Sequence, residues 1–214
     1  MAGFRMHITV SSLCGIVYGG AAVKPLSFEP EVGILAAGVT ALGGMLPDLD
    51  SDSGRPVREL SALAAAILPM LLVRRLLNSG FTHESVIVIS AVLYFLIRYL
   101  GSHILRRISV HRGMWHSIPT MVIFGLIVYL EYNSNDVRIR IILAGGVMVG
   151  FLSHLILDEL YSVDFNGIRI RLNQFAGSAL KFFSPSWIGT TVCYAILGLL
   201  AYLAYMDSLA YLKN

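Results

Sequence analysis

The sequence predicts an all-α, polytopic membrane protein whose helices form a bundle. Of its 214 residues, 56% are hydrophobic and only 14% are charged, whereas soluble domains carry about 25% charged residues. The mean hydropathy is +0.72, and the hydrophobic residues are grouped into runs of membrane-helix length. The same composition excludes a disordered chain. We therefore expect one membrane-embedded domain that covers residues 1–214.

Seven apolar segments account for most of the chain, and we expect five to seven membrane helices from them. A helix needs about 20 residues to cross a bilayer, with a range of roughly 17–25. The last five segments meet this requirement. The first two are shorter and rich in Gly and Ala, which is typical of half-buried or re-entrant segments. The segments lie at about 7–23, 31–46, 61–77, 84–105, 117–133, 137–158 and 187–206.

Pairs of glycines four residues apart predict close helix packing within the membrane. Gly15 and Gly19 form one pair in the first segment, and Gly146 and Gly150 form another in the sixth. Small residues at this spacing allow two helix backbones to approach each other closely.

Residues 161–172 have a different pattern, which predicts a short β-hairpin. Polar and apolar residues alternate on both sides of the turn dipeptide Asn166-Gly167. The stretch QFAGSALKFF that follows, residues 174–183, is typical of the membrane interface. A hairpin on the bilayer surface would contact lipid headgroups, and a solvated loop is an equal alternative.

The polar clusters of the chain are predicted to reach one side of the membrane. If all seven segments cross, that side receives His7, the Asp-rich loop at 47–59 and the loop with His111 and His116. It also receives the end of the sixth segment, which has the sequence HLILDE at 154–159.

The spacing of these residues favours a shared site. His154 and Asp158 are four residues apart, so they occupy one face of a helix. Alternate aspartates project to the same side of an extended loop, and Asp48, Asp50 and Asp52 have this spacing. His111 and His116 are about 140° apart on a helix, which places one in the loop and the other at a helix start.

Together these side chains predict a metal site. Carboxylates beside a bilayer cost several kcal/mol unless they are neutralised, and a divalent cation neutralises them. Imidazole with carboxylate suits zinc, manganese or iron. Taken singly, each residue has an ordinary alternative, because histidines are common at membrane interfaces and Asp-rich loops cap helices. The candidate ligands are His7, Asp48, Asp50, His111, His116, His154 and Asp158.

Four motifs identify a resemblance to a known family. They are MH at 6–7, LPDLDSDSG at 46–54, HRGMWHS at 111–117 and GFLSHLILDELYS at 150–162. The set resembles the LexA-regulated, membrane-bound metal-dependent hydrolase family, from His7 to about Trp187. The resemblance implies a multi-pass protein of the bacterial inner membrane, control by the SOS response, and a hydrolase site made of the same seven candidate ligands.

The family is in turn distantly similar to zinc-dependent phospholipase C and P1-type nucleases. Those enzymes surround a metal cluster with His-x-x-x-Asp and His-x-x-x-Glu pairs. This chain has one His-x-x-x-Asp pair, His154 and Asp158, and no His-x-x-x-Glu pair. We therefore expect one or two metal ions, with zinc preferred and manganese the alternative.

The expected reaction is hydrolysis of a phosphoester in a lipid or a membrane-proximal substrate. A metal-activated water is the nucleophile in this hypothesis. Asp50 is a ligand or the general base, and Asp52 is the second candidate for that base. Arg112 and Arg55 are candidates to bind phosphate oxygens, although Arg55 is also a typical membrane-surface charge.

Two other functions fit the same residues. A metal or proton transporter would place His and acidic residues deep within several helices. A non-catalytic membrane protein with a structural metal site would have a closed coordination shell.

Nucleic acid is excluded as a partner because the arginines are dispersed over several loops. Membrane lipids are the expected partners.

Basic residues predict that the polar side faces the cytoplasm. Positive charges are enriched in cytoplasmic loops. The polar side has nine Lys and Arg residues, namely Arg5, Arg55, Arg58, Arg106, Arg107, Arg112, Arg169, Arg171 and Lys181. The other side has six, namely Lys24, Arg74, Arg75, Arg138, Arg140 and Lys213.

Overall fold

The computed structural model describes most of the chain and divides it into two compact units. The described residues are 3–50, 62, 65–66, 69–70, 72–73, 75–101, 114–166, 169–172 and 180–212. The first unit comprises Met1–Pro47, Arg112–Leu130 and Asp136–Asn214. The second comprises Asp48–His111 and Glu131–Asn135.

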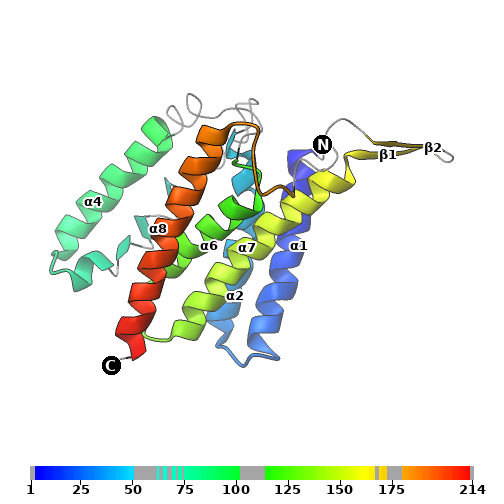
Figure 1. Cartoon of the computed structure of the whole chain (residues 1–214). Helices are drawn as coiled ribbons and strands as arrows, with labels where there is room; N and C mark the ends of the chain where they lie inside the picture. Colours follow the sequence, from blue (N-terminus) through cyan, green and yellow to red (C-terminus); the bar gives the residue numbers. More distant parts are fainter. Residues whose placement is uncertain are drawn as a thin grey trace. The chain divides into compact units, whose positions relative to one another are not determined.

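The first unit is a helical bundle that holds most of the candidate ligands that the structure describes. Helices α1, α2 and α7 pack against one another, and Figure 1 shows all the helices of the unit. A short 3₁₀ helix, η1 (Leu46–Asp50), follows α2. The helices are α1 (Phe4–Val23), α2 (Pro30–Gly43), α6 (Ile118–Glu131), α7 (Val137–Leu160) and α8 (Trp187–Leu212).

The two glycine pairs lie where helices pack closely, as predicted. A Cβ atom on Gly15 of α1 would stand 2.5 Å from the carbonyl oxygen of Ala37 on α2. A Cβ on Gly150 of α7 would collide with the carbonyl oxygen of Thr40, also on α2. Backbone cannot move aside as a flexible side chain can, so these contacts fix the distances between α2 and its two neighbours.

Two apolar clusters join α6 to the helices beside it. Met121 of α6 packs with Phe151 and Leu155 of α7, and Phe151 and Leu155 are completely buried. Met114, just before α6, packs with Ile123 and with Cys193 of α8. These clusters hold the start of α6 between α7 and α8.

Among the described residues, five helices are long and apolar enough to cross a membrane, which confirms the predicted all-α polytopic fold. The first two segments were predicted too short, because the candidate spans there extend over 20 and 19 residues, and the second span continues past α2 into η1. The fifth segment was predicted too long. Its helix, α6, has 14 residues, or about 21 Å, against a hydrocarbon thickness of about 30 Å. The five spans are Phe4–Val23, Pro30–Asp48, His83–Leu100, Val137–Leu160 and Trp187–Leu209.

A buried arginine ties three helices together at one end of the first unit. Arg140 on the first turn of α7 is 5% exposed. Its Nε donates a hydrogen bond to the carbonyl oxygen of Tyr129 on α6, at 2.9 Å. Its Nη2 lies 2.7 Å from Oδ2 of Asp207 on α8. The guanidinium also lies over the Tyr129 ring, 4.2 Å from the centroid. The sequence analysis had treated Arg140 as a loop charge only.

The second unit contains α4 (His83–Phe95), which continues into a π-helix, η2 (Leu96–Gly101). The side chain of Thr82 accepts a hydrogen bond from the backbone N–H of Ser85 and so caps α4. Within the same unit, Arg75 forms an exposed ion pair with Glu131 at 3.3 Å. The segment predicted at 61–77 lies only partly within the described residues.

The predicted hairpin is present directly after α7. Strand β1 (Val163–Asn166) pairs with β2 (Arg169–Leu172) in antiparallel register, and Asn166 is opposite Arg169. Asn166 is therefore a strand residue and not the first residue of the turn, as had been predicted. Figure 1 shows the hairpin extending beyond the C-terminal end of α7.

Candidate metal centre

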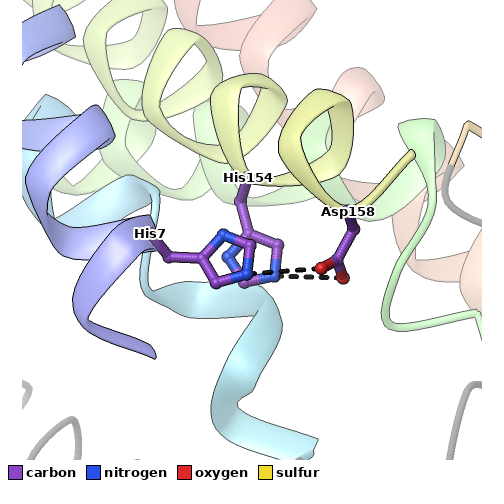
Figure 2. Close-up of side chains that lie close together, drawn as sticks. All are labelled: His7, His154 and Asp158. Carbon is purple, nitrogen blue, oxygen red and sulfur yellow. Dashed lines mark ion pairs between the residues drawn. The ribbon is translucent and has the colours of Figure 1, made fainter. Parts of the chain in front are cut away.

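Three of the candidate ligands meet at one end of the first unit. His7 lies in the first turn of α1, while His154 and Asp158 lie one turn apart near the end of α7. Figure 2 shows both imidazole rings directed toward the Asp158 carboxylate. Residues about 150 positions apart in sequence thus share one site, in agreement with the predicted His154–Asp158 face.

The carboxylate of Asp158 faces both histidines. Oδ1 lies 3.3 Å from His7 Nε2, and Oδ2 lies 3.7 Å from His154 Nε2. The two imidazole rings are stacked, with centroids 3.7 Å apart and planes 14° apart. Two positively charged rings would repel each other at this separation, so the stack favours at least one neutral histidine.

Gly44 fixes the tautomer of His154. His154 Nδ1 lies 2.7 Å from the carbonyl oxygen of Gly44, the residue that caps the C-terminus of α2. A carbonyl oxygen only accepts hydrogen bonds, so Nδ1 carries the proton. A neutral His154 then directs the lone pair of Nε2 toward Oδ2 of Asp158. Two electron-rich atoms face each other, and this arrangement is stable when a metal ion or a proton lies between them.

All three side chains are buried, which makes this arrangement costly without such a cation. His7 is 3% exposed, His154 is 1% exposed and Asp158 is 7% exposed. Among the described residues, Nδ1 of His7 is buried and has no hydrogen-bond partner. Burial of polar and charged groups costs several kcal/mol unless they are paired or coordinate a metal.

His116 lies beside this group and is held by the start of α6. Its side chain is buried, and its ring centroid lies 5.7 Å from that of His154. Ser117 caps the helix, because its Oγ accepts from the Thr120 N–H and donates to the Met114 carbonyl. Thr120 Oγ1 donates to the same carbonyl at 2.7 Å. Ser117 and Thr120 thus hold the start of α6, and with it His116, in place.

Trp115 connects the start of α6 to the first residue of η1. Its Nε1 donates a hydrogen bond to the carbonyl oxygen of Leu46 at 3.1 Å, and its ring meets the edge of Phe124. The sequence analysis missed both Trp115 and Gly44. Gly44 acts through a backbone carbonyl and gives no side-chain signal, whereas a tryptophan adjacent to a candidate ligand could have suggested a support.

Of the remaining candidates that the structure describes, Asp48 and Asp50 belong to the second unit. Asp48 is the first residue of the second unit and directly follows Pro47, which belongs to the first unit. The side chain of Asp48 is half-buried. Asp50 ends η1, and only its backbone is described. The other predicted site residues lie outside the described residues, and they are Asp52, Arg55, His111 and Arg112.

The described geometry fits a divalent cation. One ligand atom each from His7, His154 and Asp158 can be chosen so that all three lie within 4.8 Å of one another. Zinc–ligand distances of about 2.0–2.1 Å in a tetrahedron place two ligands about 3.3 Å apart. The observed separations of 3.3 and 3.7 Å are close to this value.

Comparison with known families decides the identity of the chain at the family level. The family model for the YdjM inner membrane protein matches residues 1–206. The chain belongs to the YdjM inner membrane protein family. This membership and the five apolar helices make it a multi-pass inner membrane protein. It confirms the inner-membrane family predicted from the four motifs, whereas hydrolase activity and SOS control stay predictions. Neither the curated proteins nor the solved structures include a match to this YdjM-family chain.

Proposed function

We propose that this YdjM-family protein is a membrane-bound, metal-dependent hydrolase, with zinc or manganese held by His7, His154 and Asp158. The observation that carries the proposal is the Gly44–His154–Asp158 arrangement. The Gly44 carbonyl directs the proton of His154 to Nδ1, which leaves Nε2 to face a buried carboxylate at 3.7 Å. Metal-bound histidines commonly donate their second ring N–H to a carbonyl in this way.

Further ligands are proposed from the chain around this group. His116 is supported by its buried position beside His154. Asp48 is proposed because it directly follows Pro47, which is fully buried in the first unit. Asp50 and His111 complete the set that the sequence predicts. Seven candidates can accommodate one or two ions.

The proposed reaction is hydrolysis of a phosphoester. A bound divalent cation lowers the pKa of its water from 15.7 toward about 7 and so provides hydroxide near neutral pH. Asp50 is proposed to accept the proton of that water, with Asp52 as the second candidate. Arg112 and Arg55 are proposed to bind the phosphate oxygens, because guanidinium groups pair with phosphate in two-pronged geometry.

The position of the group supports a lipid or membrane-proximal substrate over transport. His7 is the fourth residue of α1, and Asp158 is the third residue from the end of α7. Within the described helices, every His, Asp and Glu lies within two turns of a helix end. A transport pathway would instead require such groups near the middle of several spans.

One observation favours a second candidate, a structural metal site. His7, His154 and Asp158 are all less than 10% exposed, and structural sites have closed coordination shells whereas catalytic sites keep an open position. The two candidates agree on metal binding and differ on turnover.

The decisive experiment measures metal content and turnover of the protein in lipid nanodiscs. The hydrolase proposal expects stoichiometric zinc or manganese and metal-dependent release of phosphate or a phosphorylated headgroup from bacterial membrane lipids. Asp50→Asn should abolish turnover, and Asp158→Asn should abolish both turnover and metal binding. Glu159→Gln, on the next residue of α7, is the matched control. Stoichiometric metal without turnover of any lipid or nucleotide substrate would establish the structural site, and absence of metal would refute both candidates.

We also propose that the metal centre faces the cytoplasm, on the basis of the nine basic residues predicted on that side. The segment before α8 lies near the centre, because the Ile118 N–H donates a hydrogen bond to the Lys181 carbonyl. The other end of α8 lies near Arg140, which pairs with Asp207. A reporter fused after Asn214 should therefore be active only if it works in the periplasm. Activity of a cytoplasmic reporter at that position would reverse the orientation.

A further inference from the structure

The segment that leads into α8 carries a group of exposed aromatic side chains. We call residues 180–188, with the sequence LKFFSPSWI, the aromatic loop. Phe182 is 55% exposed, Phe183 is 69% exposed and Trp187 is 76% exposed. Leu180 and Ile188 at its two ends are exposed as well. Contiguous apolar surface of this kind marks an interaction site.

The backbone of the aromatic loop is well anchored, so the exposure of its side chains is not a result of loose packing. The Phe182 carbonyl accepts a hydrogen bond from the Tyr194 hydroxyl at 3.1 Å, and the Phe183 ring stacks on the Tyr194 ring. The Ser184 N–H donates to Thr190 Oγ1 at 3.1 Å. The loop therefore has a defined shape that presents its aromatic rings outward.

The chemistry of the aromatic loop matches the lipid headgroup region. Its irregular backbone, which contains Pro185, cannot face hydrocarbon, because polar backbone groups need partners there. Its aromatic rings are unfavourable in water. Trp and other aromatic residues at the ends of membrane helices occupy the interface, where both requirements are met. Trp187 is also the first residue of a candidate membrane span.

The aromatic loop contacts the start of α6, close to the candidate ligand His116. The Ile118 N–H donates to the carbonyl oxygen of Lys181 at 3.1 Å, and Ile118 is two residues after His116. Thr120 Oγ1 lies 3.7 Å from Sγ of Cys193, which is about 9 Å along α8 from Trp187. The depth of the loop in the bilayer thus sets the depth of the histidines.

We infer that the aromatic loop is a membrane-interface anchor that rests among phospholipid headgroups. Through Ile118 and α8 it holds His116 and His154 at the level where headgroups meet acyl chains. This placement is independent of metal binding and of any reaction, because it depends only on the contacts between the loop, α6 and α8. If the proposed hydrolysis takes place, the placement gives the centre lateral access to the phosphate group of a membrane lipid.

Tryptophan fluorescence tests the inference, because the chain has two tryptophans, Trp115 and Trp187. Trp115→Phe leaves Trp187 as the only reporter, and the variant is reconstituted in phosphatidylcholine vesicles with nitroxides at defined depths. Headgroup-region nitroxides should quench Trp187 more strongly than nitroxides near the bilayer centre. Stronger quenching from the centre, or quenching only by aqueous acrylamide, would overturn the inference, as would no quenching by either.

Two further measurements keep the test decisive. If Trp115→Phe fails to fold, the difference between the wild type and Trp187→Phe gives the Trp187 signal in a native background. The depth of the metal centre is measured with Tyr161→Trp in a protein without the other two tryptophans, because Tyr161 is exposed and caps α7 three residues after Asp158. Its quenching profile should match that of Trp187. If nitroxides in the acyl-chain region quench this tryptophan most strongly, the metal centre does not lie at the interface and the inference is wrong.

Discussion

The two ends of the first unit both bury charged groups, but they satisfy them in different ways. At one end, Arg140 bonds the Tyr129 carbonyl and pairs with Asp207, so donors meet acceptors and opposite charges meet. At the other end, about 21 Å along α7, the Asp158 carboxylate faces a His154 nitrogen whose proton lies on the far side of the ring. The first end is an ion pair within the chain, whereas the second is the site where we propose that a cation binds.

We propose that this difference distinguishes a structural ion pair from a cation-binding site. A buried pair whose members satisfy each other contributes to the fold and needs no ligand. A buried acceptor facing another acceptor is an electrostatic deficit that a bound cation removes. Loss of a carboxylate should therefore weaken ligand binding at the His154 end, whereas loss of the arginine should weaken the fold at the Arg140 end.

The largest expected effect follows from Asp158→Asn. An amide cannot replace the carboxylate as a charged ligand, so zinc affinity should fall by more than about 100-fold, beyond the 10–100-fold typical for supporting residues. Isothermal titration of the metal-free protein with zinc measures the change. Glu159→Gln should leave the affinity within about 3-fold. Equal affinities for Asp158→Asn and the wild type would remove the distinction between the two ends.

Zinc should stabilise the wild type through the same group. Free zinc at 100 times its dissociation constant adds about 2.7 kcal/mol to the free energy of unfolding. Thermal unfolding in detergent, with zinc and with a chelator, gives the shift in Tm. In Asp158→Asn the shift should disappear, whereas in Arg140→Met it should persist. A shift that survives in Asp158→Asn would place the metal elsewhere.

Arg140→Met tests the opposite end. Breaking a buried ion pair costs about 3–5 kcal/mol, but the Asp207 side chain is 38% exposed, so solvent reduces the cost to about 2 kcal/mol. Chemical unfolding should show this loss with unchanged zinc affinity. The control is Arg138→Met, because Arg138 pairs with Asp136 at the surface and its loss should cost less. Reduced zinc affinity in Arg140→Met would couple the two ends.

The smallest effect is expected for Thr120→Val, which removes a buried hydroxyl near His116. Its bond to the Met114 carbonyl is lost, but Ser117 still donates to that carbonyl. The cost should be about 1 kcal/mol. Thr191→Val, which removes an exposed hydroxyl bonded to the Trp187 carbonyl, is the control and should change Tm less. A similar loss in both variants would mean that the hydroxyl does not support His116.

The sequence predicted the helices better than their ends. The apolar run 137–158 corresponds closely to α7 because its ends are marked by charged residues. The start of α1 was placed too late, because Phe4–Met6 contains Arg5 and does not look apolar, although a helix can begin with a charge. The predicted end of the fifth segment was two residues too late, because Tyr132 and Asn133 follow Glu131 without any sharp change in hydropathy.

For the candidate site, the types of ligand and the pairing of His154 with Asp158 could be predicted from the sequence, but the way the site assembles could not. The spacing of His154 and Asp158 was sufficient to place them on one helix face. The approach of His7 depends on how α1 packs on α7, which no local pattern specifies. Gly44 orients His154 through its backbone carbonyl. Every residue type has such a carbonyl, so the sequence does not indicate this role. Metal binding by these residues stays a prediction.

The cluster unites the first turn of α1 with the last turns of α7, and this has a consequence for biosynthesis. During translation, α1 enters the membrane long before α7 has been made. The close approach of Gly15 to Ala37 allows α1 and α2 to associate as an early hairpin. His7 gains its partners only when the ribosome has added some 150 further residues, so assembly of the centre reports that nearly all of the bundle has been inserted.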